Sequence, residues 1–295
     1  MLSACPNLRE VGLVFNSSSE IDKLLDALAG ISTIEKIRVR SMEVLDDAGV
    51  GMTAGIAEEF LHRATLPSLK ELDVGPFASS SFTSSPQNPH PIQALYVNLD
   101  KGEIGTAYPL LPTKLCVLRS LSLRGYGSES SGDDLVKLVE LVGRTLTSFC
   151  ICSKTITKVS TGTGHRKLVG PALPLELFKL LPSVQHLTVA GFETLSVNRV
   201  AALSLSSPSL ITLDFGHSSW TPDGGQTTFS GAADELVPVF AACDHLQRVH
   251  LGVVPASINA RWIESTFADR DVEVEWTALG RTRSKVLRRR TREGD

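Results

Sequence analysis

Long apolar runs and a strong excess of charge of one sign are both missing from this 295-residue chain. No stretch reaches the roughly 18 uninterrupted apolar residues that a membrane-spanning helix needs. The opening Met1-Leu2-Ser3-Ala4-Cys5-Pro6 lacks the basic region and apolar run of a secretory signal. The formal net charge of -3 exerts no strong attraction on nucleic acid or on anionic membranes.

Cysteine is also scarce. The five cysteines form an odd and scattered set: Cys5, Cys116, Cys150, Cys152 and Cys243. Such a set favours free thiols in a reducing compartment over a disulfide framework. Together with the missing secretory signal, it predicts a cytoplasmic or nuclear protein.

Signatures of catalysis and of cofactor binding are missing as well. Gly127 to Asp133 has the glycine spacing of a phosphate-binding loop, but Asp133 stands where the phosphate-binding lysine must be. Cys150 and Cys152 share a face of a predicted strand, and His186 belongs to the next one, yet the spacing typical of zinc sites is absent. We therefore predict that the chain is no enzyme and has no catalytic residue, metal or cofactor.

One six-residue phrase, by contrast, recurs along the chain. It consists of an apolar residue, two variable ones, an apolar one, one variable one and a third apolar one, as in Leu69-Lys70-Glu71-Leu72-Asp73-Val74. Clear copies begin at residues 8, 34, 69, 118, 146, 184, 210 and 246, and a weaker copy begins at 92. Most steps between them are 23 to 28 residues, within the length of about 20–29 residues that is typical of leucine-rich repeats.

Helical patterns lie between the phrases, at 20–28, 55–63, 133–142, 198–205 and 234–240, and Val272, Val274 and Trp276 suggest a closing strand. Strands that alternate with helices indicate parallel strands. Repeats of this kind bury their apolar faces by stacking. We predict an α/β fold, a leucine-rich-repeat solenoid (horseshoe) with a parallel concave sheet and helices on the convex side.

The predicted repeat domain covers residues 1–276, with polar insertions near 77–91, 154–174 and 216–231. Residues 277–295 are expected to form a basic, disordered tail, because 281–292 contains seven cations. A nuclear localisation signal or a nucleic-acid arm is the alternative for this tail, although we expect neither a nucleic-acid nor a membrane partner.

The phrase and its lead-ins, such as Cys5-Pro6-Asn7-Leu8 and Leu66-Pro67-Ser68-Leu69, resemble the leucine-rich-repeat region of F-box proteins, most of all the fungal ones. The resemblance implies the substrate-recognition repeats of a ubiquitin-ligase receptor. No F-box is visible in this chain, so the Skp adaptor and cullin are expected partners only if an F-box lies upstream. The alternatives are a free-standing repeat scaffold without a ligase role and, ranked last, a GTPase activator of the Ran type.

The variable positions of each phrase predict where a protein ligand binds. They alternate with the buried positions and therefore point away from the core, onto the concave face. The resulting ladder mixes charges of both signs, which suits a specific protein partner better than a polyanion. The predicted protein-binding residues are Lys36, Arg38, Arg40, Glu71, Asp73, Tyr96, Asn98, Arg124, His186, Asp214, Arg248 and His250.

Overall fold

A computed structural model describes two compact units, Met1–Leu146 and Thr147–Asp295, which are treated separately below. The described residues are 5, 7–15, 28, 31–41, 68–76, 92–98, 117–127, 132–153, 159–160, 166–167, 173–192, 195–196, 208–216, 218, 220–221, 237, 240–254, 258–278 and 281–288. Several predicted segments lie outside these ranges: the helices at 55–63 and 198–205, the insertion at 77–91, and most of the helix at 20–28.

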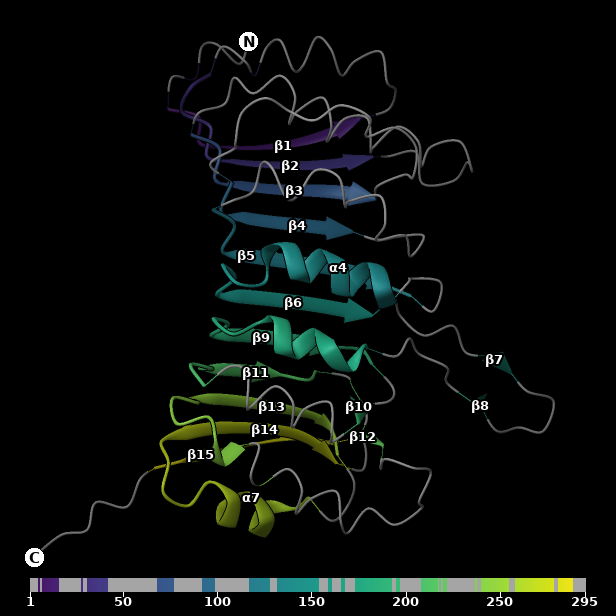
Figure 1. Ribbon diagram of the computed structural model, residues 1–295, viewed down its shortest axis with the longest axis vertical. Helices are drawn as coiled ribbons and strands as arrows, with labels where there is room; N and C mark the ends of the chain where they lie inside the picture. The colour runs from purple at the N-terminus through teal and green to yellow at the C-terminus, as the bar shows by residue number, and fades with distance from the viewer. Residues whose placement is uncertain are drawn as a thin grey trace, which may run out of the picture. The chain divides into compact units, whose positions relative to one another are not determined.

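Unit 1 contains a parallel sheet whose described strands follow chain order (Figure 1). The strands are β1 (Glu10–Phe15), β2 (Lys36–Ser41), β3 (Glu71–Pro76), β4 (Ala94–Asn98) and β5 (Ser120–Tyr126). Each begins at the third residue of a phrase. The middle apolar residues of the phrases are register partners, so that Val11, Ile37, Leu72, Leu95 and Leu121 form one buried row. The predicted phrases are therefore strands.

The strands of unit 2 repeat this arrangement. Parallel pairing joins β6 (Ser148–Ser153), β9 (His186–Ala190), β11 (Thr212–Asp214), β13 (Arg248–Val253) and β14 (Val272–Ala278) in that order. The expected strand at Val272, Val274 and Trp276 is confirmed as β14, and all three side chains are buried. Two short strand pairs lie outside this sheet. The strands β7 (Val159–Ser160) and β8 (Arg166–Lys167) pair within the predicted insertion at 154–174. The strand β12 (Trp220–Thr221) of the insertion at 216–231 pairs with β10 (Leu195–Ser196), which lies outside the predicted insertions.

One backbone feature fixes the start of the strands. The carbonyl of the residue after the first apolar position accepts two amide hydrogens from the next phrase: Arg9 O accepts from Glu35 N (2.8 Å) and Lys36 N (3.0 Å). The carbonyls of Glu35, Lys70 and Gln93 in unit 1, and of Thr147, Gln185 and Ile211 in unit 2, do the same. A carbonyl oxygen has two lone pairs and can accept both bonds. Because the acceptor is a backbone carbonyl, both bonds can form whatever side chain stands at this position.

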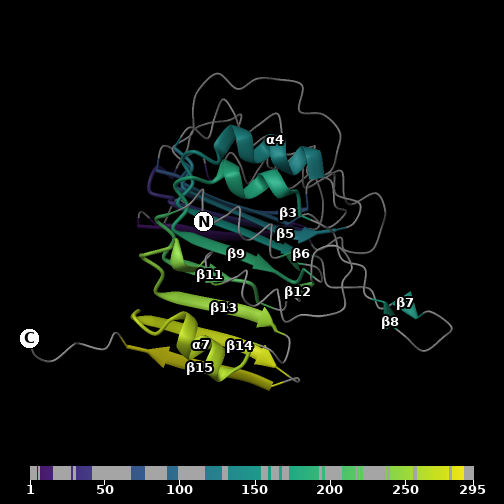
Figure 2. The ribbon, with the colours of Figure 1, turned by 60° about the horizontal axis from the view of Figure 1, so that its bottom comes forward.

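Helices supply the other layer of the fold. In unit 1, α4 (Gly132–Val142) confirms the helix predicted at 133–142, and it buries Leu135, Leu138, Val139 and Val142. Unit 2 has a 3₁₀ helix (Leu175–Leu180) and α7 (Ala260–Thr266). Figure 2 shows α4 along one side of the strands of unit 1, and α7 beside β14 and β15. No helix within the described ranges is long and apolar enough to cross a membrane.

Arginine and asparagine side chains secure helix ends in unit 2. The Asn259 side chain caps α7 by accepting hydrogen bonds from the backbone amides of Arg261 (3.0 Å) and Trp262 (3.2 Å). The Arg270 guanidinium donates to the carbonyls of Phe240 (2.6 Å), Ala241 (2.7 Å) and Cys243 (2.7 Å). These carbonyls lie where the helical residues 240 and 241 end, and a cation is favourable there.

The predicted disordered tail is wrong for the residues that the structure describes in it. Ala278 belongs to β14, and Arg281–Leu287 form β15, which pairs antiparallel with β14 over its whole length. The cations of 281–292 suggested a solvated tail, but β-branched Thr282 and Val286 alternate with those cations in a strand-like period of two. The Thr277 and Thr282 hydroxyls also lie 3.2 Å apart across the hairpin.

A bulge in β13 requires glycine at position 252. Gly252 has a φ of +71°, and the register of β13 against β14 shifts between His250 and Val253. A Cβ atom there would collide with the Phe215 carbonyl oxygen and lie 2.6 Å from that of Ser218. Ser218 is fully buried, and its hydroxyl donates to Val189 O (3.0 Å) and accepts from Phe192 N (3.0 Å). The bulge and the turn at 215–218 therefore pack backbone against backbone.

The substitution Gly252→Ala is expected to lower the free energy of unfolding by about 2 kcal/mol or more, because it combines a left-handed φ with a backbone collision. Gly12→Ala in β1 is the matched control. A Cβ at Gly12 would meet nothing within 4 Å, so the change should stay within about 0.5 kcal/mol. Urea unfolding followed by circular dichroism measures both, and equal effects would contradict the packing described for the bulge.

Candidate functional site

The polar face of each sheet arises from strand alternation. In unit 1, two rows of register partners lie on the side opposite the buried row of Val11 and Ile37. The first row consists of Glu10, Lys36, Glu71, Ala94 and Ser120, and the second of Gly12, Arg38, Asp73, Tyr96 and Ser122. The structure thus brings together the predicted residues Lys36, Arg38, Glu71, Asp73 and Tyr96.

Ion pairs cross the strands of this face. Lys36 Nζ lies 2.6 Å from Glu71 Oε2, and Arg38 Nη2 lies 3.0 Å from Glu10 Oε1. The hydrogen bond to Glu71 raises the pKa of Lys36. The Arg38–Glu10 pair is exposed, and pairs of that kind contribute about 0–1 kcal/mol to stability, whereas Lys36 and Glu71 are half-buried. The main consequence of both pairs is a surface on which positive and negative groups alternate from strand to strand.

Three further predicted residues lie at the ends of the unit 1 strands. Asn98 is the register partner of Arg124, and the Arg124 side chain is exposed. Arg40 is paired with Val14 at the end of β2. The side chains of Arg40 and Asn98 lie outside the described residues.

Unit 2 presents two comparable rows. The first contains Ser148, His186, Thr212, Arg248 and Glu273, and the second contains Cys150, Thr188, Asp214, His250 and Glu275. His186 Nδ1 lies 2.9 Å from Thr212 Oγ1, and Arg248 Nε donates to Glu273 Oε2 at 3.1 Å. The four residues predicted in unit 2, His186, Asp214, Arg248 and His250, therefore share one face.

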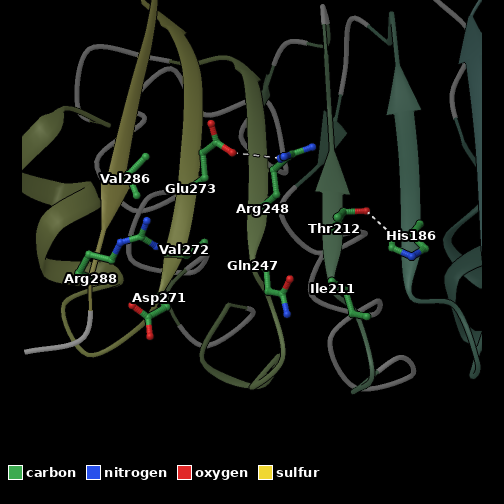
Figure 3. A pocket seen from close by; sticks show the side chains of 10 residues that line it. All are labelled: His186, Ile211, Thr212, Gln247, Arg248, Asp271, Val272, Glu273, Val286 and Arg288. Atoms are coloured by element: carbon green, nitrogen blue, oxygen red, sulfur yellow. Dashed lines mark hydrogen bonds and ion pairs between the residues drawn. The ribbon is translucent and has the colours of Figure 1, made fainter. Parts of the chain in front are cut away.

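A groove of about 560 Å³ runs over the first row of unit 2 (Figure 3). Its floor is polar, because the His186–Thr212 and Arg248–Glu273 pairs cross between neighbouring strands. It ends at β15, where Val286 is 52% exposed. The groove is lined by His186, Ile211, Thr212, Gln247, Arg248, Asp271, Val272, Glu273, Val286 and Arg288.

The second row of unit 2 contains a histidine–carboxylate pair. His250 Nδ1 lies 2.9 Å from Asp214 Oδ1, and the same oxygen accepts a hydrogen bond from Gly216 N at 2.8 Å. The hydrogen bond to Asp214 raises the pKa of His250, and the charge of Glu275 on β14 acts in the same direction. Gly216 leaves room for the pair, because a Cβ there would lie 3.3 Å from the imidazole ring.

The two cysteines of β6 do not join a larger ligand set. Their Sγ atoms are 3.6 Å apart on one face of the strand. His186 is the register partner of Ser148 and bonds to Thr212. Within the described ranges there is no group of three or more side chains that could hold a metal ion.

Some residues of the polar face were missed by the sequence analysis, although a signal existed for part of them. Glu10 occupies the same phrase position as Lys36, and Glu273 and Glu275 alternate with the predicted closing positions Val272 and Val274. Val286 carried no such signal, because it lies in the segment predicted as a disordered tail.

Comparisons with known proteins do not assign a family. No family model matches the chain, and no curated protein matches its sequence. Among solved structures, it is similar to a Bacteroides fragilis protein whose crystal structure was determined as a structural genomics target, with 12% identity and a TM-score of 0.46. The match covers 91% of this chain and 65% of that protein, so the chain spans less than two thirds of its length.

The His250–Asp214 pair predicts a pH dependence. A histidine pKa that is raised on folding contributes stability fully below the unfolded value of about 6.5, and this contribution is lost as the pH rises through the folded pKa. In Asp214→Asn the side-chain oxygen can still accept from Gly216 N, but the charge is gone.

We therefore expect a lower His250 pKa in Asp214→Asn, measured by NMR titration of the imidazole. The loss of stability relative to the parent chain should be largest below pH of about 6.5 and should shrink at higher pH. An unchanged His250 pKa in the variant would contradict the role given to Asp214.

Proposed function

We propose that this chain is a leucine-rich-repeat protein whose polar sheet face binds another protein. The observation that carries the proposal is the shared register of the phrases. In each unit it directs the same phrase positions into the core and the intervening positions onto one face. Stacked strand-and-helix units of this kind form extended binding surfaces.

The charge pattern favours a protein over a polyanion. In unit 1 the face alternates Glu10, Lys36 and Glu71 in one row, and Arg38 and Asp73 in the next. In unit 2 it combines Arg248 and His250 with Asp214, Glu273 and Glu275. Mixed charges reward a partner with the complementary pattern and repel others, whereas a nucleic acid is held by a surplus of cations.

The groove of unit 2 supports the same choice of partner. Drug-sized ligands bind in pockets that are mostly apolar, whereas most side chains that line this groove are polar. An extended peptide offers main-chain and side-chain groups along its whole length and matches such a lining better.

In its narrower form, the proposal is that these are the substrate-recognition repeats of an F-box-type ubiquitin-ligase receptor. This form rests on the resemblance of the phrase and its lead-ins alone. It requires an F-box in the same polypeptide, because that domain docks to the Skp adaptor. A free-standing repeat scaffold binds its client without the adaptor.

Affinity capture with matched variants tests the proposal. The tagged chain is recovered from its own cells, and each co-purifying protein is quantified by mass spectrometry. Tyr96→Ala changes the polar face of unit 1, and Arg248→Glu changes that of unit 2. Glu140→Lys, at an exposed position of α4, is the control, because it reverses one charge as Arg248→Glu does.

The recovered amount of a true client is expected to decrease at least about tenfold with one or both polar-face variants. Interface tyrosines and arginines often contribute about 2 kcal/mol or more to the binding free energy. Glu140→Lys should leave it unchanged. A client that is lost only with Glu140→Lys would contradict the polar face as the binding surface. Recovery of the Skp adaptor and cullin together with the client supports the ligase form, and recovery of a client without them supports the scaffold.

A further inference from the structure

The strand β15 lies at the edge of the unit 2 sheet. Its inner side pairs with β14, and no other described strand pairs with its outer side. An edge strand presents unpaired backbone amide and carbonyl groups, which are a template for another strand. The side chains of β15 are mostly exposed.

The antiparallel register sorts the side chains of β15 by charge. Arg281, Arg283 and Lys285 are register partners of Ala278, Trp276 and Val274, and therefore lie on the side of the sheet that packs against helices. An ion pair between Lys285 Nζ and Glu264 of α7 agrees with this placement. Arg281 and Arg283 are both exposed, and neither forms an ion pair with another described residue.

The alternate side chains of β15 are uncharged. Thr282, Ser284 and Val286 are partners of Thr277, Glu275 and Glu273, so they continue the polar face. Val286 is exposed at the end of the groove (Figure 3). Within β15 the edge thus shows cations on one side and small or apolar groups on the other, with a period of two residues. Arg288, directly after the strand, lines the groove together with Val286.

We propose that the outer edge of β15 accepts an extended acidic segment of another protein as an additional strand. Acidic residues at alternate positions lie opposite Arg281 and Arg283, and the intervening small or apolar residues lie beside Val286. Main-chain hydrogen bonds supply affinity in this mode, and the alternate side chains supply specificity. Opposite charges directly across two strands attract one another, whereas like charges repel.

Charge on an edge strand also has a purely protective use, since it discourages pairing between copies of the chain. The two uses differ in a measurable way. A protective edge rejects every added strand, whereas a receptive edge selects strands whose charge is complementary. Because the proposal rests on the backbone edge of β15 and on Arg281 and Arg283, which lie on the other side of the sheet from the polar face, it can fail while the proposed function stands.

Synthetic peptides and the full chain test the proposal. The probe is a dye-labelled eight-residue peptide in which glutamate alternates with valine and threonine. One control replaces each glutamate by glutamine, and a second has the same composition with its glutamates grouped together. Fluorescence anisotropy measures binding, and hydrogen exchange measures protection of the β15 amides. A single-stranded oligonucleotide of the same net charge reports general attraction to anions.

The alternating acidic peptide is expected to bind about tenfold more tightly than either control peptide, and to slow exchange of the β15 amides. Arg283→Glu should weaken its binding about tenfold or more, because the substitution places like charges across the two strands. Arg144→Glu, at an exposed position after α4, makes the same charge change and should leave binding unchanged.

Three results would overturn the proposal. The first is no binding of the alternating peptide, which would make the charges of β15 protective. The second is equal binding of the grouped peptide or the oligonucleotide, which would show attraction to anions without strand pairing. The third is binding without added protection of the β15 amides.

Discussion

The arrangement of both units depends on one hydrogen-bonding constraint, the backbone carbonyl at each strand entrance that accepts two amides of the following phrase. In unit 1 the carbonyls of Arg9, Glu35, Lys70 and Gln93 do so, and in unit 2 those of Thr147, Gln185 and Ile211. Both amides belong to consecutive residues, so the next strand cannot slip by one position without losing a bond. A slip of one residue would turn every buried side chain to the solvent side.

This constraint explains how repeats of unequal length keep one register. The bonds form within the phrase, so residues between two phrases do not affect them. The steps from 8 to 34 and from 34 to 69 differ by nine residues, yet β1, β2 and β3 pair in the same register. The shared register also arranges the polar face, because it makes side chains from distant parts of the sequence neighbours across strands.

The sequence predicted the parts of the fold that local periodicity determines. The phrases correspond to the parallel strands, and the apolar spacing of 133–142 corresponds to α4. The antiparallel strand β15 could not be predicted this way, since its stability comes from pairing with β14 and its composition resembles a solvated tail. Helix α7 was also missed, because it is short and is fixed by Asn259 and by burial of Ile263.

For the polar face, the sequence predicted which residues share a side but not how they pair. The contacts of His250 with Asp214 and of His186 with Thr212 require the register between strands whose phrases begin 26 to 36 residues apart. The groove of unit 2 likewise depends on β15. Side-chain partners and cavities are tertiary properties, which the period of a single strand does not encode.

The most direct test of the shared register is the distance between two spin labels in each unit, measured by pulsed electron resonance in a chain whose native cysteines are replaced. Glu10 and Ser120 lie in one row of unit 1, and Ser148 and Glu273 lie in one row of unit 2, each pair four strand intervals apart. With about 4.8 Å between strands, the account predicts a narrow distribution of label-to-label distances centred at about 19 Å for both pairs. A broad distribution, or one centred beyond about 30 Å for either pair, would contradict the in-register stacking of the phrases on which the binding face depends.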